Sequence, residues 1–144
     1  MKTAEKGKTF LGFDYGRRFL GVAVGQTVTR TAKPLMTLKA EKGVPQWSQV
    51  QELVHTWKPA ALIVGWPLNM DGTAQFTTEE AEQFVAELSK RFQLQVYTVD
   101  ERLTTVEAKA RLFEQGGYKA LDKSKIDAVS AQIILEAWMS ENEL

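Results

Sequence analysis

The sequence predicts a single α/β domain built from a mixed five-stranded sheet with helices on both faces. Two apolar segments, "TFLGFD" and "FLGVAVG", are separated by only four residues. That gap permits an antiparallel hairpin and excludes a crossover helix. After the hairpin, strand-like and helix-like segments alternate along the chain, which is typical of sheets with parallel central strands. A length of 144 residues fits one domain spanning residues 1–144.

Five segments have the composition of strands. The hairpin strands cover residues 9–14 and 19–25, and "AKPLMTL" at 32–38 predicts a third strand. "AALIVG" at 60–65 is a short continuous apolar run, which is typical of a strand covered on both faces. "LQVYTVD" predicts the fifth strand, ending at Asp100. The hairpin strands are therefore antiparallel, and the later strands can be parallel.

The first two predicted helices follow from apolar residues at helical spacing. One covers residues 46–57, with a predicted core face of Trp47, Val50, Leu53, Val54 and Trp57. The other runs through Phe92 and opens with the capping-box pair Thr77 and Glu80. Its predicted inward side chains are Ala81, Phe84, Val85 and Leu88.

Two further helices are predicted near the end of the chain. The first opens with the capping-box pair Thr104 and Glu107 and stops at Gly116 and Gly117. The second opens at Ser124. Its predicted core residues are Ile126, Val129, Ile133, Ile134 and Ala137.

Composition and charge limit the class of protein. The chain has no cysteine and a formal net charge of zero, so we expect a cytoplasmic protein without disulfides or thiolate metal sites. Zero net charge argues against indiscriminate binding of nucleic acid, although a local basic face remains open. No stretch of about 18 apolar residues indicates a membrane span, and the polar start "MKTAEKGK" does not resemble a signal peptide.

Carboxylates stand at the edges of three apolar elements. Asp14 ends the first strand, Asp100 and Glu101 end the last strand, and Asp127 is expected in the first turn of the last helix. The carboxyl ends of parallel strands meet at one edge of a sheet, where α/β proteins build their sites. Acids gathered there repel one another unless cations neutralise them, and oxygen ligands favour Mg²⁺ or Mn²⁺. Two such ions roughly 3.5–4 Å apart could activate a water against a phosphodiester.

Each acid also has a purely structural explanation. Asp14 with Gly16 can form an Asx turn. Asp100 or Glu101 can pair with Arg102 at the strand end. Asp127 follows Ser124 by three residues, so it can serve as a capping-box acid near the positive end of the helix dipole.

Four segments resemble the motifs of the YqgF family, also called RuvX. They are "DYGRRFLGVAVG", "VGWPLNMDGT", "DERLTTVEA" and "KIDAVSAQIILE", in the order and spacing of that family over residues 9–136. Members of the family are described as pre-16S ribosomal RNA nucleases and were earlier predicted to be Holliday junction resolvases. The resemblance implies an RNase H-like fold related to RuvC.

The resemblance also implies a function and a catalytic site. It implies a cytoplasmic, metal-dependent nuclease that trims the 5′ end of the small-subunit ribosomal RNA precursor. Its catalytic acids would be Asp14, Glu101 and Asp127, with Asp100 as a helper, all binding Mg²⁺ or Mn²⁺. RNase H-like nucleases commonly carry an acid where this chain has Gly65-Trp66-Pro67, so Glu101 would approach from the fifth strand. The number of metals stays open.

Cationic and polar residues flank the acids. The loop "NMDGT" at 69–73 follows a strand, and its Asn69 can donate hydrogen bonds to phosphates; a plain solvated loop is the alternative. The cations nearest the acids in the sequence are Arg17, Arg18, Arg102, Lys119, Lys123 and Lys125. This clustering predicts a rim that attracts phosphates.

Several functions remain open at this stage. Within the nuclease interpretation, precursor ribosomal RNA is favoured and a four-way DNA junction is the alternative. The oligomeric state, monomer or homodimer, is not determined. Other hypotheses are a non-catalytic module bound to RNA or ribosomal particles, and a phosphotransferase related to actin-like ATPases. The last needs two such domains, and 144 residues supply one.

Overall fold

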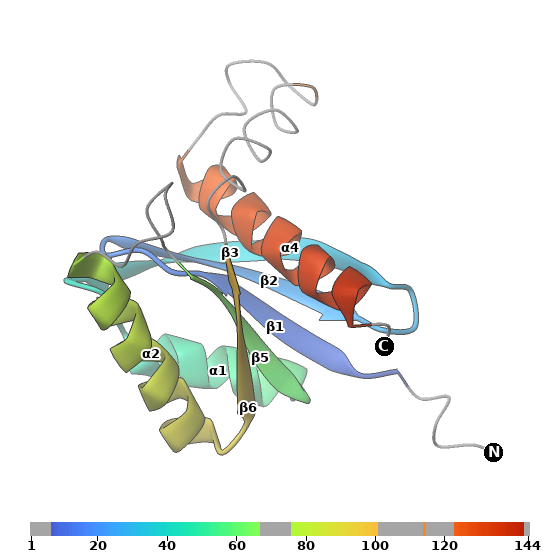
Figure 1. The fold of residues 1–144 in the computed structure, drawn as a ribbon, viewed down its shortest axis with the longest axis horizontal. Helices are drawn as coiled ribbons and strands as arrows, with labels where there is room; N and C mark the ends of the chain where they lie inside the picture. The colour runs from blue at the N-terminus through green and yellow to red at the C-terminus, as the bar shows by residue number, and fades with distance from the viewer. Residues whose placement is uncertain (1–6, 67–75, 101–113, 115–122, 143–144) are drawn as a thin grey trace.

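The computed structural model describes residues 7–66, 76–100, 114 and 123–142, within which six strands form one mixed sheet (Figure 1). The strands are β1 (Thr9–Asp14), β2 (Phe19–Gln26), β3 (Thr31–Glu41), β4 (Val44–Pro45), β5 (Ala61–Trp66) and β6 (Gln95–Asp100). Their order across the sheet is β4-β3-β2-β1-β5-β6. The predicted α/β class is confirmed.

The two kinds of strand pairing match the prediction. β1 and β2 are antiparallel, with Asp14 opposite Gly21. β5 runs parallel to β1, with Gly65 beside Asp14, and β6 runs parallel to β5. The carboxyl ends of β1, β5 and β6 therefore lie at the same edge of the sheet.

The predicted count of five strands is one short, because β4 was not foreseen. β4 has two residues and pairs with Ala40 and Glu41 of β3. The turn between them is Lys42-Gly43, with φ angles of 52° and 83°. Positive φ at both central residues is the pattern of a type I′ hairpin turn. A strand of two residues is too short to show an alternating pattern in the sequence.

Helices cover both faces of the sheet, as predicted (Figure 1). α1 (Trp47–Trp57) and α2 (Phe76–Phe92) lie on one face, and α4 (Lys123–Glu141) lies on the other. The residues predicted on the apolar faces of α1 and α2 are all buried or half-buried in the core between these helices and the sheet. They are Trp47, Val50, Leu53, Val54, Trp57, Ala81, Phe84, Val85 and Leu88. None of the described helices combines the length and apolarity needed to span a bilayer.

Two helices begin two residues earlier than their capping-box patterns predict. α2 begins at Phe76, which places Thr77 inside the helix instead of at its cap. α4 begins at Lys123, which likewise places Ser124 inside. The capping-box patterns marked the right neighbourhoods but not the first residues. The predicted helix from Thr104 to Gly116 lies outside the described residues, except for Glu114, which is helical.

One predicted core residue of α4 is exposed. Four of the five predicted side chains are buried, whereas Ala137 faces solvent. Residues 126–131 are all buried, so the first half of α4 is buried on every side. Its sequence therefore does not separate an apolar face from a polar one. The second half packs on the sheet through Ile134, Leu135 and Trp138, and Ala137 lies off that face.

Phe84 joins the two helices of the first face to the sheet. Its ring lies 5.7 Å from that of Trp47 in α1. It lies 6.0 Å from the ring of Phe13 in β1 and 4.9 Å from the ring of Tyr15, which follows β1. Edge-to-face and offset ring pairs of this kind add to the gain from burial. This contact fixes α2 against the end of β1.

α4 approaches β1 and β2 over glycines. A Cβ atom at Gly12 would stand 2.9 Å from the Cβ of Leu135, and one at Gly21 would overlap the backbone carbonyl of Asp127. A Cβ atom at Gly25 would meet only the flexible ends of Leu135 and Met139. The helix and the sheet therefore touch backbone to backbone at Gly21, which only glycine permits.

The turn after β1 is tied to the turn after β3. The Tyr15 hydroxyl donates a hydrogen bond to the Gly43 carbonyl at 2.9 Å, and the Gly43 amide donates to the Arg17 carbonyl at 2.9 Å. A Cβ atom at Gly43 would overlap the Tyr15 hydroxyl. Burial, and next the charge of Glu80, raise the pKa of Tyr15 to about 12. Gly16 has no positive φ, and a Cβ atom there would stand 2.9 Å from the Phe19 carbonyl oxygen.

Gly21→Ala should destabilise the fold by about 3 kcal/mol, because its methyl group meets the backbone of α4 and neither element can yield locally. Gly25→Ala is the matched control, and should cost about 1 kcal/mol or less since side-chain ends can move aside. Urea denaturation followed by circular dichroism measures both. Equal losses in the two variants would contradict the backbone contact at Gly21.

The raised pKa of Tyr15 makes stability fall at high pH. The unfolded chain loses the Tyr15 proton near pH 10, whereas the folded chain keeps it until about pH 12. The stabilisation is therefore complete below pH 10 and is lost as the pH rises toward 12. Tyr15→Phe should flatten the dependence of unfolding free energy on pH in that window. Parallel curves for parent and variant would contradict the assignment.

Candidate functional site

Asp14 lies at the carboxyl end of β1, on the face of the sheet that α4 covers. Gly12, two residues earlier, packs against α4, and alternation along the strand puts Asp14 on the same face. Its side chain is half-buried. Asp14 is in register with Gly65 of β5 on one side and Gly21 of β2 on the other. Gly21 is in turn in register with Thr37 of β3.

Asp127 is brought to Asp14 by the close approach of α4. Its backbone carbonyl sits over Gly21, which pairs directly with Asp14 across the hairpin. Asp127 is only 5% exposed. The two acids come from nearly opposite ends of the sequence, and the packing of one helix on one glycine brings the backbone at Asp127 to the edge of the sheet that carries Asp14.

The prediction that Asp127 lies in the first turn of the last helix is wrong. α4 begins at Lys123, and its first turn holds no acidic residue. A capping acid must reach the free amides of the first turn. Asp127 lies beyond that turn and is buried on the sheet, so the capping explanation does not fit its position.

Asp100 is the last residue of β6, and its backbone pairs with Trp66 of β5. Val99, one residue earlier, is in register with Gly65 and packs on the α4 side of the sheet. The end of β6 therefore lies at the edge that carries Asp14. Glu101 lies outside the described residues, as does the side chain of Asp100.

Oxygen ligands suited to Mg²⁺ or Mn²⁺ are present at this edge in Asp14 and Asp127. Within the described ranges, no group of three or more acidic, histidine or cysteine side chains gathers. Because two of the four predicted ligands fall outside those ranges, the described part holds half of the predicted set. Its donor chemistry fits a hard divalent cation.

The predicted phosphate-binding residues are only partly described. Arg18 is exposed in the turn after β1. Lys123 and Lys125 lie at the start of α4, and their side chains are outside the described set. Three other predicted residues, Asn69, Arg102 and Lys119, lie wholly outside it.

Arg17 differs from the other predicted phosphate-binding residues because it forms an ion pair. Its Nε lies 2.9 Å from Oε1 of Glu80 in α2. Glu80 was predicted only as a capping residue, because no local pattern reveals a contact between a turn and a helix so far along the chain. Thr37, in register with Gly21, was also missed.

A cavity of about 190 Å³ lies beside this ion pair, lined in part by Tyr15, Gly43, Glu80 and Glu87. Tyr15 belongs to the core under α1 and α2, on the opposite face of the sheet from Asp14. The cavity is therefore separate from the paired acids.

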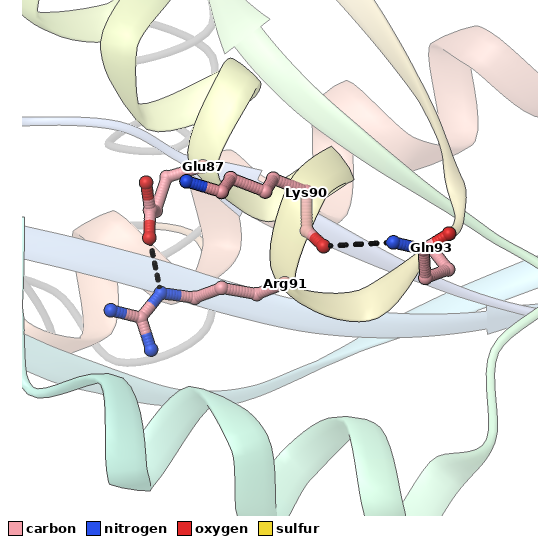
Figure 2. A network of polar contacts seen from close by, with 4 residues as sticks. All are labelled: Glu87, Lys90, Arg91 and Gln93. Atoms are coloured by element: carbon pink, nitrogen blue, oxygen red, sulfur yellow. Dashed lines mark hydrogen bonds and ion pairs between the residues drawn. The ribbon is translucent and has the colours of Figure 1, made fainter.

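A second arginine–glutamate pair closes the far end of α2 (Figure 2). Arg91 Nε lies 2.6 Å from Oε2 of Glu87, one turn earlier, and the guanidinium lies 4.6 Å from the centre of the Trp47 ring. The Gln93 side chain donates to the Lys90 carbonyl at 3.2 Å. These contacts finish the helix and are not connected to Asp14.

Comparison with known proteins identifies the family. The sequence model of the RuvX family, described as Holliday junction resolvase, matches residues 8–141. A protein of Aeromonas salmonicida named "Putative pre-16S rRNA nuclease" is 56% identical, over 93% of this chain and 96% of its own. One of the same name from Shewanella denitrificans is 54% identical, over 94% and 96%.

Solved structures identify the fold. RuvC of T. thermophilus, in complex with a Holliday junction substrate, matches with a TM-score of 0.55 and 18% identity, over 93% of this chain and 95% of that one. The Holliday junction resolvase of fowlpox virus matches with a TM-score of 0.55 and 14% identity, over 94% and 99%. The fold is therefore the RNase H-like fold of RuvC. With the family model and the close relatives in agreement over nearly the whole sequence, this chain belongs to the RuvX family.

Proposed function

We propose that this chain is a metal-dependent nuclease that hydrolyses phosphodiester bonds in the 5′-end maturation of the small-subunit ribosomal RNA precursor. The observation that carries the proposal is that the backbone carbonyl of Asp127 lies over Gly21, the residue opposite Asp14 in the hairpin. The names of relatives that are more than half identical supply the substrate. A non-catalytic module would not need two acids from distant elements at one point.

The proposed cofactor is Mg²⁺ or Mn²⁺, held by Asp14 and Asp127 together with Glu101 and Asp100. Such a cation stabilises the negative charge that develops on the phosphate in the transition state. The protein's part is to hold carboxylates at one edge, where burial under α4 limits water and strengthens their attraction to a cation. Without metal, the negative charges of these carboxylates repel one another and destabilise the folded protein.

Between Asp100 and Glu101, we assign the main role to Glu101 and the helper's role to Asp100, as the resemblance to the family implies. The part of β6 that leads to these acids lies on the α4 side of the sheet. Tyr97 packs on Trp138 of α4, with ring centres 5.1 Å apart, and Val99 packs on the same side.

The proposed phosphate contacts are Arg18, Asn69, Arg102, Lys123 and Lys125. They flank the acids in the sequence, and cations beside a catalytic edge raise the local concentration of nucleic acid. Arg17 was predicted in the same set, but its Nε pairs with Oε1 of Glu80, and we propose a different role for it below. Ribosomal particles are a proposed partner, in the cytoplasm, with the protein acting as a monomer or a homodimer.

A Holliday junction resolvase is the second candidate. The family description and the RuvC structure bound to a junction both favour it. A resolvase has to cut two strands symmetrically, so it would act as a dimer.

Cleavage of matched substrates tests the proposal. The parent and Asp14→Asn are incubated with precursor 16S RNA, unrelated single-stranded RNA and a four-way DNA junction, in Mn²⁺ or Mg²⁺. We expect the parent to cut the precursor, and Asp14→Asn to be inactive because an amide lacks the charge that the cation needs. Cleavage of the junction alone would favour the resolvase. Full activity of Asp14→Asn would refute the metal site.

Asp127→Asn should separate catalysis from folding. We expect the variant to unfold near the parent temperature, to lose activity by at least about a hundredfold and to bind Mn²⁺ more weakly in calorimetry. Asp127→Glu should also lose activity, since the longer side chain misplaces the carboxylate. A variant that melts lower but keeps its activity per folded molecule would make Asp127 a structural residue.

A further inference from the structure

We propose that Arg17 is a positioning residue for Asp14 and not a phosphate contact. This inference rests on the proposed nuclease function. Through its ion pair with Glu80, Arg17 anchors the turn that follows Asp14 to α2. Two adjacent arginines in one turn thus have different roles although both are exposed: Arg17, with 44% of its side chain accessible, also pairs with Glu80 and holds the turn in place.

The ion pair is partly enclosed. The side chain of Glu80 is 18% exposed, and its Oε1 atom, which faces Arg17, is buried. A buried carboxylate that loses its cationic partner carries a large desolvation cost. Moving the Arg17 guanidinium out to a phosphate would therefore leave Glu80 uncompensated.

Three contacts hold the turn after β1 in place. The Gly43 amide donates to the Arg17 carbonyl at 2.9 Å, and the Ala40 amide donates to the Arg18 carbonyl at 2.8 Å. Glu80 holds the Arg17 side chain from α2. These contacts link the turn to β3 and the residues that follow it, and to α2.

Asp14 stands directly before this turn, so the position of its carboxylate depends on the turn. On the other side Asp14 is fixed by the strand register with Gly21 and Gly65. A displacement of about 1 Å at a catalytic group can cost on the order of a hundredfold in rate. Arg17 and Glu80 thus act on catalysis through Asp14.

The two roles predict opposite effects at Glu80. If Arg17 contacts phosphate, removing Glu80 frees the guanidinium and tightens substrate binding. If Arg17 positions the turn, removing Glu80 lowers kcat and leaves KM unchanged. Glu87 is a matched control, because it lies on the same helix and also pairs with an arginine, but that arginine is Arg91 of α2 itself (Figure 2).

The experiment compares Arg17→Met, Glu80→Met, their double variant and Glu87→Met on the substrate that the parent cuts. We expect each single change at Arg17 or Glu80 to lower kcat by about tenfold or more, with KM within about twofold of the parent. The double variant should be no slower than the slower single one, since both remove the same contact. Glu87→Met should match the parent.

Salt dependence gives a second measure of Arg17. The slope of log affinity against log salt should be the same for Arg17→Met and the parent, whereas a lost phosphate contact would lower it by about one unit. A lowered slope, a parental kcat for Glu80→Met, or tighter binding by Glu80→Met would each overturn the proposal.

Amide hydrogen exchange keeps this test separate from the proposed function. Exchange at residues 15–18 should be faster in Arg17→Met and Glu80→Met than in the parent or in Glu87→Met, whether or not the protein cuts RNA. If the parent cuts none of the substrates, the proposed function fails, and exchange alone judges the anchoring by Glu80. Unchanged exchange at these residues would refute the anchoring. Circular dichroism confirms that each variant compared is folded.

Discussion

The contact between α4 and the hairpin at Gly21 is the constraint on which the proposed site depends. Protein interiors are packed so densely that one methyl group at a backbone contact forces a helix to move. Because Gly21 has no side chain, the Asp127 carbonyl can lie directly on β2, next to the strand that carries Asp14. Gly12 extends the close approach along β1. Because Gly21 has no side chain, the backbone at Asp127 can lie close to the strand that carries Asp14.

The opposite face of the sheet supplies rigidity rather than ligands. Phe84 packs against Phe13, Tyr15 and Trp47, and so ties α2 to the end of β1 and to α1. Glu80 lies one turn before Phe84 on the same helix, which places its carboxylate beside the turn after β1. The aromatic packing and the ion pair support the same few residues from one side, while α4 covers them from the other.

Much of the fold could be predicted because its signals are local. Alternation and apolar runs located the hairpin, β5 and β6 to within one residue and β3 to within three, and helical spacing located the buried faces of α1 and α2. The short β4 left no pattern, and the enclosed start of α4 gave no clear face, which is why Ala137 was misplaced. The acids were found as strand-end residues, but whether Asp127 capped a helix depended on a helix start that sequence patterns locate only within a few residues. The Arg17–Glu80 pair joins distant segments, and no local pattern encodes it.

The distance along the chain between the hairpin and α4 has a consequence for the time at which activity can arise. Gln132 of α4 donates to the Ala32 carbonyl, one hundred residues earlier in the sequence. Contacts of such long range form late, because the chain must first lose the entropy of the loop between the two segments. During synthesis they cannot form until α4 has been made. A nascent chain that has already folded its hairpin carries Asp14 but lacks Asp127. On the proposed mechanism, the part of the chain already synthesised cannot cut RNA until α4 has been made and has packed on the hairpin.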